Sequence, residues 1–374
     1  MDMHGIIFAY NSAIGMRELT EKRTAAAVTF AAQYKAIDFM LSNMVNSGIS
    51  DVGVVMRENY QPLIDHLGTG VPWDLSRKNG GLRILPPFGM SRASSREGYR
   101  GKMDSLIDIF SYIKEIRQKY ILLADGDIIA NIDFDDVLRH HIETGSDMTI
   151  VCVPASNALS SDAHFSFDLS GFAVDVVTKS EQRSDYESTG VATLGVYLLE
   201  KSLFISFIEK YASKSMFTFE RDLLKELYAA MKVSGYMFSG FASRIHSVRS
   251  YFNDNMLLLE EAARQSLFNP ASPIKTKSVD AASTYYSPGA VVHRCLVADG
   301  CHIDGDVSNC ILAQGVRIEK GAKVSNCIIM QDVVIGKDVR LEYVISDNDV
   351  RINDRRELIG QESYPVIIAK GSVI

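Results

Sequence analysis

The chain has 374 residues, of which 47% are hydrophobic and 23% are charged, so it is long enough for two or three globular domains. This composition excludes a disordered or fibrous protein. The net charge of −7, from 39 basic and 46 acidic residues, gives no general attraction to nucleic acid or to an anionic membrane, although it leaves room for a local anion pocket.

Neither a membrane segment nor a cysteine framework is indicated. The apolar run from Gly5 to Ala9 is bounded by polar residues, and no stretch reaches the roughly 18 apolar residues of a membrane span. The five cysteines include no C-x-x-C pair, which argues against disulfides and against a zinc site. We therefore expect a cytoplasmic protein that has buried thiols and binds neither nucleic acid nor membrane.

Up to residue 245, short apolar runs alternate with amphipathic stretches. The expected strands are His4–Ala9, Val52–Met56, Leu82–Leu85, Tyr120–Ala124, Met148–Val153 and Thr193–Leu199. The expected helices are Tyr34–Ser47, Tyr60–Leu67, Met103–Gln118, Asp135–Thr144 and Phe219–Met231, followed by Tyr251–Gln265. This alternation predicts a mostly parallel sheet covered on both faces, with ligands bound at the carboxyl ends of its strands.

The pattern changes after a linker that contains Pro270 and Pro273. The run Ser308–Leu312 returns 17 residues later as Ser325–Ile329, and a related run at Glu342–Ile345 follows after another 17. Within each unit aliphatic residues recur every six positions, which is typical of a parallel β-helix with three short strands in each coil. Three cysteines share one position of the repeat, so we expect an inert stack of reduced, buried thiols: Cys295, Cys310 and Cys327.

Several runs in the N-terminal part carry a family resemblance. They are Leu19–Arg23, Tyr34–Phe39, Leu41–Ile49, Trp73–Leu75, Tyr99–Gly101, Leu122–Asp127, Ala192–Tyr197 and Tyr251–Met256. Together with the repeats they resemble bacterial ADP-glucose pyrophosphorylase (glucose-1-phosphate adenylyltransferase) over nearly the whole chain. The resemblance implies an α/β, Rossmann-like nucleotidyltransferase domain followed by a left-handed parallel β-helix of hexapeptide repeats. We place the first domain at residues 1–250, a helix and linker at 251–280, and the β-helix at 281–374.

Members of this family join ATP to glucose 1-phosphate with the help of Mg²⁺ and release pyrophosphate, chemistry that depends on positioning and on neutralising charge. Their first strand runs into a Gly-Gly-x-Gly-x-x-Arg loop that cradles the triphosphate. Here that loop reads Tyr10-Asn11-Ser12-Ala13-Ile14-Gly15, so it contains no glycine before Gly15 and Gly15 stands where the arginine is expected, which makes Asn11 and Gly15 degenerate positions of the motif. Arg17 fits the arginine position only in a shifted register. The neighbouring family lysine, linked to anion or effector binding, is replaced by Ala25.

The resemblance implies that two aspartates bind Mg²⁺. The first is present as Asp127, which on the residues alone fits a helix N-cap equally well. Arg244 stands at the position of the second, and no Asp or Glu occurs from Leu227 to Phe252. A cation in place of a ligand repels the metal, so we expect poor Mg²⁺ binding.

The sugar-phosphate contacts are better preserved. The resemblance assigns substrate contacts to Tyr99, Lys179 and Thr193, although on the residues alone Lys179 fits a surface lysine equally well. The family's Gly-Thr-Ala-Asp-Ala motif is altered, because it reads Gly101-Lys102-Met103-Asp104-Ser105 in this chain.

These features favour a catalytically degenerate, GlgD-type regulatory subunit that assembles with a catalytic subunit. The resemblance implies that the assembly is a tetramer formed partly through the β-helix domains. Two alternatives stay open: an active adenylyltransferase with a rearranged phosphate loop, and a stand-alone sugar-phosphate sensor. An acyltransferase using His293 or His302 would leave the first domain unexplained.

Overall fold

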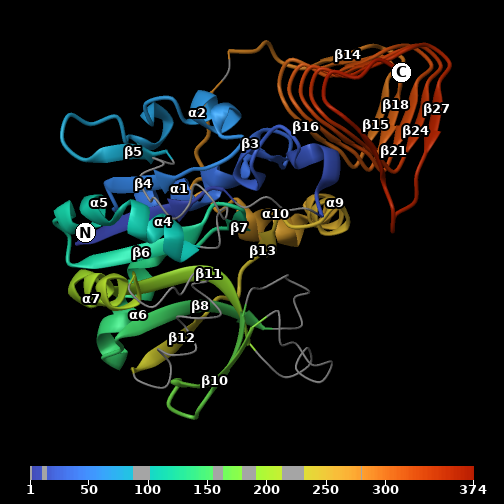
Figure 1. Ribbon diagram of the computed structural model, residues 1–374. Coiled ribbons are helices and arrows are strands. Elements are labelled where there is room, and N and C mark those ends of the chain that lie inside the picture. The colour runs from blue at the N-terminus through green and yellow to red at the C-terminus, as the bar shows by residue number, and fades with distance from the viewer. Residues whose placement is uncertain are drawn as a thin grey trace. The chain divides into compact units, whose positions relative to one another are not determined.

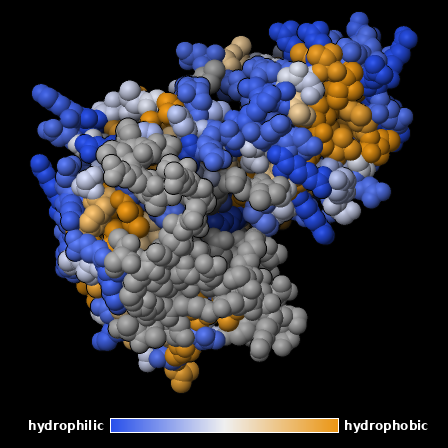
Figure 2. All heavy atoms as spheres, in the orientation of Figure 1, coloured by the Kyte–Doolittle hydropathy of each residue, from blue (hydrophilic) through white to orange (hydrophobic). Residues whose placement is uncertain are grey.

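The computed structural model describes residues 2–10, 15–86, 102–154, 163–178, 191–212, 231–278 and 280–374 (coloured in Figure 1 and Figure 2). The chain forms two compact units. The first consists of residues 1–10, 39–58 and 68–242, and the second consists of residues 11–38, 59–67 and 243–374. Among the described residues, no helix has the length and apolar character needed to cross a bilayer.

The first unit is built on a nine-stranded sheet (Figure 1). Its strands are β1 (Met3–Phe8), β4 (Asp51–Val55), β5 (Gly81–Leu85), β6 (Tyr120–Asp125), β8 (Met148–Pro154), β9 (Ala163–Phe167), β10 (Ala173–Thr178), β11 (Val191–Glu200) and β12 (Val233–Met237). The order is β10-β9-β11-β6-β1-β4-β5, and β8 lies between β11 and β12. The strands from β6 to β5 are parallel, as the alternating pattern predicts, whereas β11 runs antiparallel to both β6 and β8.

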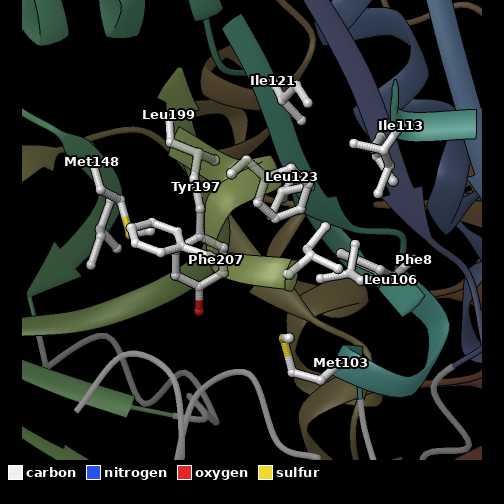
Figure 3. Close-up of a cluster of buried hydrophobic side chains, with 14 of the residues drawn as sticks. Phe8, Met103, Leu106, Ile113, Ile121, Leu123, Met148, Tyr197, Leu199 and Phe207 are labelled. Atoms are coloured by element: carbon white, nitrogen blue, oxygen red, sulfur yellow. The ribbon is translucent and has the colours of Figure 1, made fainter. Parts of the chain in front are cut away.

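Helices cover both faces of this sheet. They are α1 (Ala36–Asn46), α4 (Lys102–Asp108), α5 (Phe110–Glu115), α6 (Phe134–Thr144) and α7 (Lys201–Ala212), and a short strand, β7 (Ile128–Ala130), follows β6. The core under α4, α5 and α7 takes every second residue of β1, β6, β8 and β11, which is the alternation that one buried face requires (Figure 3). On the opposite face Nδ1 of His141, from α6, contacts the Thr149 hydroxyl of β8 at 2.9 Å.

Three helices differ from their predicted extents, and one of them, predicted as Tyr251–Gln265, is divided in the structure into Val248–Leu257 and Glu261–Leu267 because Glu260 has an extended backbone. The apolar period from Met103 to Gln118 continues unbroken, but the helix divides at Ile109, whose φ and ψ of −96° and 14° depart from helical values. The stretch expected to be helical from Tyr34 begins with a strand, because Ala31 and Ala32 adopt positive φ and turn the chain back on itself. Alanine carries no turn signal, so periodicity cannot reveal this hairpin. The helix predicted at Phe219–Met231 lies outside the described residues, apart from Met231.

The second unit contains the N-terminal hairpin, three helices and the β-helix. Its hairpin pairs β2 (Thr29–Phe30) with β3 (Tyr34–Lys35), and its helices are α2 (Gln61–Leu67), α9 (Val248–Leu257) and α10 (Glu261–Leu267). A last short strand, β13 (Ala242–Arg244), precedes α9. Asn255 of α9 fixes the hairpin turn, because its side-chain oxygen accepts the Ala31 N–H at 3.0 Å.

The repeats form a left-handed parallel β-helix with three strands in each coil (Figure 1). Its three sheets each contain five parallel strands. The first sheet comprises β14 (Tyr285–Tyr286), β17 (His302–Ile303), β20 (Arg317–Ile318), β23 (Val334–Ile335) and β26 (Arg351–Ile352). The second comprises β15 (Val291–His293), β18 (Asp306–Ser308), β21 (Lys323–Ser325), β24 (Arg340–Glu342) and β27 (Glu357–Ile359). The third comprises β16 (Leu296–Val297), β19 (Ile311–Leu312), β22 (Ile328–Ile329), β25 (Val344–Ser346) and β28 (Val366–Ile368).

The predicted cysteine stack is present, but Cys295 is only half-buried because it lies in the first coil. Cys310 and Cys327 are fully buried, and the Cys327 N–H donates to Sγ of Cys310 at 3.4 Å. Burial raises the pKa of the Cys310 thiol well above its usual range. The Cys310 thiol therefore stays protonated at neutral pH, and burial shields both Cys310 and Cys327 from reagents.

We predict that a thiol reagent labels Cys295 while Cys310 and Cys327 stay unmodified in the native protein. The physical reason is access, because Cys310 and Cys327 are fully buried whereas Cys295 is only partly covered. Mass mapping of a labelling time course measures this, with the unfolded chain as the control that must label fully. Labelling of Cys310 as fast as Cys295 would contradict the prediction.

Candidate functional site

The first unit has a topological switch point between β1 and β6. The chain leaves β1 toward β4 on one side, while β6 lies on the other, and the two strands are in register from Met3–Tyr120 to Phe8–Asp125. The Gly126 N–H donates to the Phe8 carbonyl at 2.8 Å, so the turn after β6 closes over the end of β1. Ligands of open α/β sheets bind outside the carboxyl ends of the strands at such a point.

A buried ion pair lies at this switch point. Nζ of Lys102, the first residue of α4, lies 2.8 Å and 2.9 Å from the two carboxylate oxygens of Asp125, the last residue of β6. Both side chains are buried, and the Lys102 ammonium also lies 5.8 Å from the centre of the Phe8 ring and 6.0 Å from that of Tyr197. The chain thus places its own cation among the groups that border the crevice.

A bulge in β11 lies beside Asp125 and leaves space for its carboxylate. The register of β11 against β8 shifts between Thr193 and Val196, and Gly195 adopts a φ of +71°. A Cβ at Gly195 would lie 2.4 Å from an Asp125 oxygen, so this position requires glycine. The Thr193 hydroxyl accepts the Gly195 N–H at 3.0 Å and is fully buried, which gives Thr193 a role in holding the bulge.

The two residues that the resemblance assigns to the metal lie in different units, and only one of them is a carboxylate. Asp127 is buried in the turn before β7, and Arg244 is a buried residue at the end of β13 in the second unit. The described residues contain no cluster of three or more His, Cys, Asp or Glu side chains that could hold a metal ion. The neighbouring carboxylate, Asp125, is already neutralised by Lys102. These residues do not fit a magnesium centre of the two-aspartate type.

Gly15 stands where the family arginine is expected, and its surroundings exclude a side chain. Gly15 forms a bridge with Ser247, and its carbonyl accepts the Val248 N–H at 3.0 Å. A Cβ at Gly15 would lie 2.5 Å from the His246 carbonyl oxygen, which is backbone and cannot move aside cheaply. Arg17 does not replace the missing arginine in this arrangement, because its guanidinium bonds the Tyr364 hydroxyl at 2.6 Å.

Three predicted positions, Asn11, Tyr99 and Lys179, lie outside the described residues. The roles predicted for Tyr99, Lys179 and Thr193 in substrate binding stay predictions. Sequence reasoning missed the pairing of Lys102 with Asp125. Its signal was an aspartate at the end of the apolar strand Tyr120–Ala124, in a chain whose Gly-Thr-Ala-Asp-Ala motif has gained a lysine.

The segment around Ala25 carries buried charges of its own. The Arg23 guanidinium forms a buried ion pair with both carboxylate oxygens of Asp347. Lys35 lies half-buried in the same unit and donates from Nζ to the Thr29 hydroxyl at 2.7 Å. Burial, reinforced by the Arg23 charge, lowers the pKa of Lys35 to about 8, and Asp38 partly offsets this shift.

Comparison with known proteins agrees with this geometry. A model of nucleotidyl transferases matches residues 5–261, and a model of the GlmU-like C-terminal hexapeptide region matches residues 280–364. Glycogen biosynthesis protein GlgD of Bacillus subtilis (strain 168) is 35% identical over 371 residues, which cover 99% of this chain and 96% of that protein. The chain belongs to the family of GlgD and glucose-1-phosphate adenylyltransferase.

Two proteins of Geobacillus stearothermophilus illustrate the relation within that family. Its GlgD is 36% identical over 372 residues, covering 99% of this chain and 97% of the relative. Its glucose-1-phosphate adenylyltransferase is 34% identical over 316 residues, covering 83% of this chain and 79% of the enzyme. Similarity to GlgD proteins therefore extends over nearly the full length of both partners.

We predict that Lys102→Met destabilises the protein by about 3–5 kcal/mol, because it leaves the Asp125 carboxylate buried without a counter-charge. Adding Asp125→Asn should restore part of this loss. Denaturant unfolding of the single and double variants measures both effects.

Lys114→Met is the matched control, because Lys114 pairs with Glu209 at 3.0 Å on an exposed surface of the same unit. That substitution should cost less than about 1 kcal/mol. Equal losses for Lys102→Met and Lys114→Met would show that the crevice pair is not structurally important.

We predict that stability rises with pH between about 8 and 10 because of Lys35. Its pKa is lower in the folded protein than the ordinary value of 10.5, so the unfolded chain binds more protons in this range. Lys35→Met should remove up to about 3 kcal/mol of this rise and stabilise the protein at pH 7. Unfolding midpoints across the range test this, with exposed Lys323→Met as the control that must keep the wild-type slope.

Proposed function

We propose that this chain is the non-catalytic, regulatory subunit of an ADP-glucose pyrophosphorylase in glycogen biosynthesis. It assembles with a catalytic subunit, and the complex makes ADP-glucose and pyrophosphate from ATP and glucose 1-phosphate. The near full-length similarity to proteins named glycogen biosynthesis protein GlgD supports the pathway.

The buried ion pair of Lys102 with Asp125 is the observation that carries the proposal. A nucleotidyl transfer site must gather several phosphates and a metal at the carboxyl ends of the strands. Here a carboxylate at the end of β6 is neutralised by a lysine of the same chain, at distances of 2.8 Å and 2.9 Å. For Asp125 to bind a metal ion or a substrate, its desolvated ion pair with Lys102 would have to break, which costs free energy.

The N-terminal loop supports the same conclusion. The backbone at His246 occupies the space that a side chain at position 15 would need, so the loop arginine could not be restored there without a backbone shift. Charge neutralisation at phosphorus contributes several kcal/mol to this class of reaction. Losing the arginine together with the second aspartate therefore removes most of the means of catalysis.

Retention of the fold supports a role in assembly. The chain keeps the elements that make its domains stable, namely the parallel strands, the core under α4, α5 and α7, and the coils of the β-helix. In contrast, the loop arginine and the second aspartate that the family uses for catalysis are replaced. A subunit can alter its partner only by contacting the partner's conformational states differently. We therefore assign the preserved surface to subunit contacts, in a tetramer formed partly through the β-helix domains.

We predict that the purified chain forms ADP-glucose more than about 10³-fold more slowly than a catalytic relative, because both the arginine and the second aspartate are missing. Pyrophosphate release with ATP, glucose 1-phosphate and Mg²⁺ measures this. A rate within about tenfold of the relative would support the rival active enzyme with a rearranged loop.

A second experiment mixes the chain with the catalytic subunit of the same organism. Light scattering should show a larger assembly, and the mixture should differ from the catalytic subunit alone in apparent substrate affinity or rate. A chain carrying Ile318→Asp, which disrupts the buried β-helix core, is the matched control and should change neither mass nor kinetics. Unchanged mass and kinetics for the wild-type mixture would favour a stand-alone sugar-phosphate sensor.

A further inference from the structure

A cavity lies at the amino ends of the strands in the first unit, at the opposite edge of the sheet from Asp125. Its volume is about 700 Å³, and His4 of β1, Asp51 of β4, Arg83 of β5 and Tyr112 of α5 line it. Lys78 and Arg117 line it as well. We call this the amino-edge cavity. The chain terminus marked N and α5 lie at this edge of the sheet (Figure 1).

The amino-edge cavity carries three cations that are not committed elsewhere. Lys78, Arg83 and Arg117 are exposed, and none of them forms an ion pair within the described part of the chain. Arg83 lies 5.2 Å from the centre of the Tyr112 ring, which holds its guanidinium beside the cavity.

The acidic residues of the cavity do not cancel this charge. Asp51 accepts the Gly81 N–H at 2.9 Å on one oxygen and the Gln118 amide on the other. A Cβ at Gly80 would lie 1.8 Å from Asp51, so the turn is built closely around this carboxylate. Glu115 is the second acid, which leaves three cations facing two acids, one of them fully hydrogen-bonded.

The floor of the cavity is a buried histidine. His4 is 5% exposed, and its Nε2 lies 2.7 Å from the Tyr112 hydroxyl. Burial lowers the pKa of His4 to about 4 and raises that of Tyr112, so at neutral pH the ring is uncharged and the hydroxyl keeps its proton. A hydrogen bond with the Gln118 side chain acts on the same ring and opposes the effect of burial on the pKa of His4, so this histidine belongs to a buried hydrogen-bond network beneath the cavity.

We propose that the amino-edge cavity binds the phosphate of a small phosphate ester, with Lys78, Arg83 and Arg117 pairing with the anion above the uncharged His4. A cavity of about 700 Å³ is much larger than a phosphate ion and accommodates a body of sugar size. The polar floor suits a hydroxyl-bearing body rather than an apolar one. This site is separate from the carboxyl-end crevice and does not depend on the function proposed above.

The test titrates the full chain with glucose 6-phosphate and with inorganic phosphate by calorimetry. We expect glucose 6-phosphate to bind, and inorganic phosphate to bind at least about tenfold more weakly because it lacks the sugar contacts. The Arg83→Gln/Arg117→Gln variant should lose at least about tenfold in affinity, since it removes two charge-assisted contacts. Arg139→Gln is the matched control, because Arg139 is exposed on α6 outside the cavity and should leave binding unchanged.

Three results would overturn the proposal: no heat of binding for the wild-type chain, equal affinity for the ester and inorganic phosphate, or wild-type affinity in the double variant. If the double variant does not fold, Lys78→Gln removes an exposed charge with little structural consequence. That variant should still bind at least about threefold more weakly than wild type. Wild-type affinity in Lys78→Gln would likewise count against the site.

Discussion

The first unit depends on a carboxylate that cannot reach water. Asp125 ends β6 in the fully buried layer of the sheet, and a desolvated carboxylate is stable there only with a counter-charge or several donors. Lys102 supplies the charge, which places the first turn of α4 over the crevice, and Gly195 leaves the space that Asp125 needs. One ion pair thus links strand β6, helix α4 and the bulge of β11, and it fixes the shape of the region where a nucleotide would have to bind.

The second unit obeys a different constraint, because each coil of its β-helix must repeat the one before it. The ladder of Ile303, Ile318, Ile335 and Ile352 is almost completely buried, so strand spacing and side-chain size are both fixed by the neighbouring coils. The ends of the array lack a neighbour on one side, which explains why Cys295 is half-buried whereas Cys310 and Cys327 are enclosed. Position in the array, rather than residue type, decides how each cysteine behaves.

The sequence predicts those features whose cause is local or periodic. Alternation of apolar residues located β1, β4, β5, β6, β8 and β11, and the repeat located the coils, because burial on a regular surface leaves a regular pattern. It could not reveal the hairpin at Ala31 and Ala32, since positive φ at alanine is imposed by a distant partner, Asn255. The pairing of Lys102 with Asp125 escaped for the same reason, because 23 residues separate two side chains that only the fold brings together. The absence of any Asp or Glu from Leu227 to Phe252, by contrast, can be read directly in the sequence.

The two ends of the sheet differ in whether their charged side chains are paired. At the carboxyl ends a cation and a carboxylate satisfy each other and are buried, so an incoming anion gains little from either. At the amino ends three cations face solvent around a neutral histidine, while the main carboxylate, Asp51, is held by Gln118 and Gly81. Charge that is already paired supports structure, whereas unpaired charge beside a cavity is available to a ligand. The charged groups at the carboxyl ends of the strands therefore stabilise the fold, whereas those at the amino ends remain exposed to solvent.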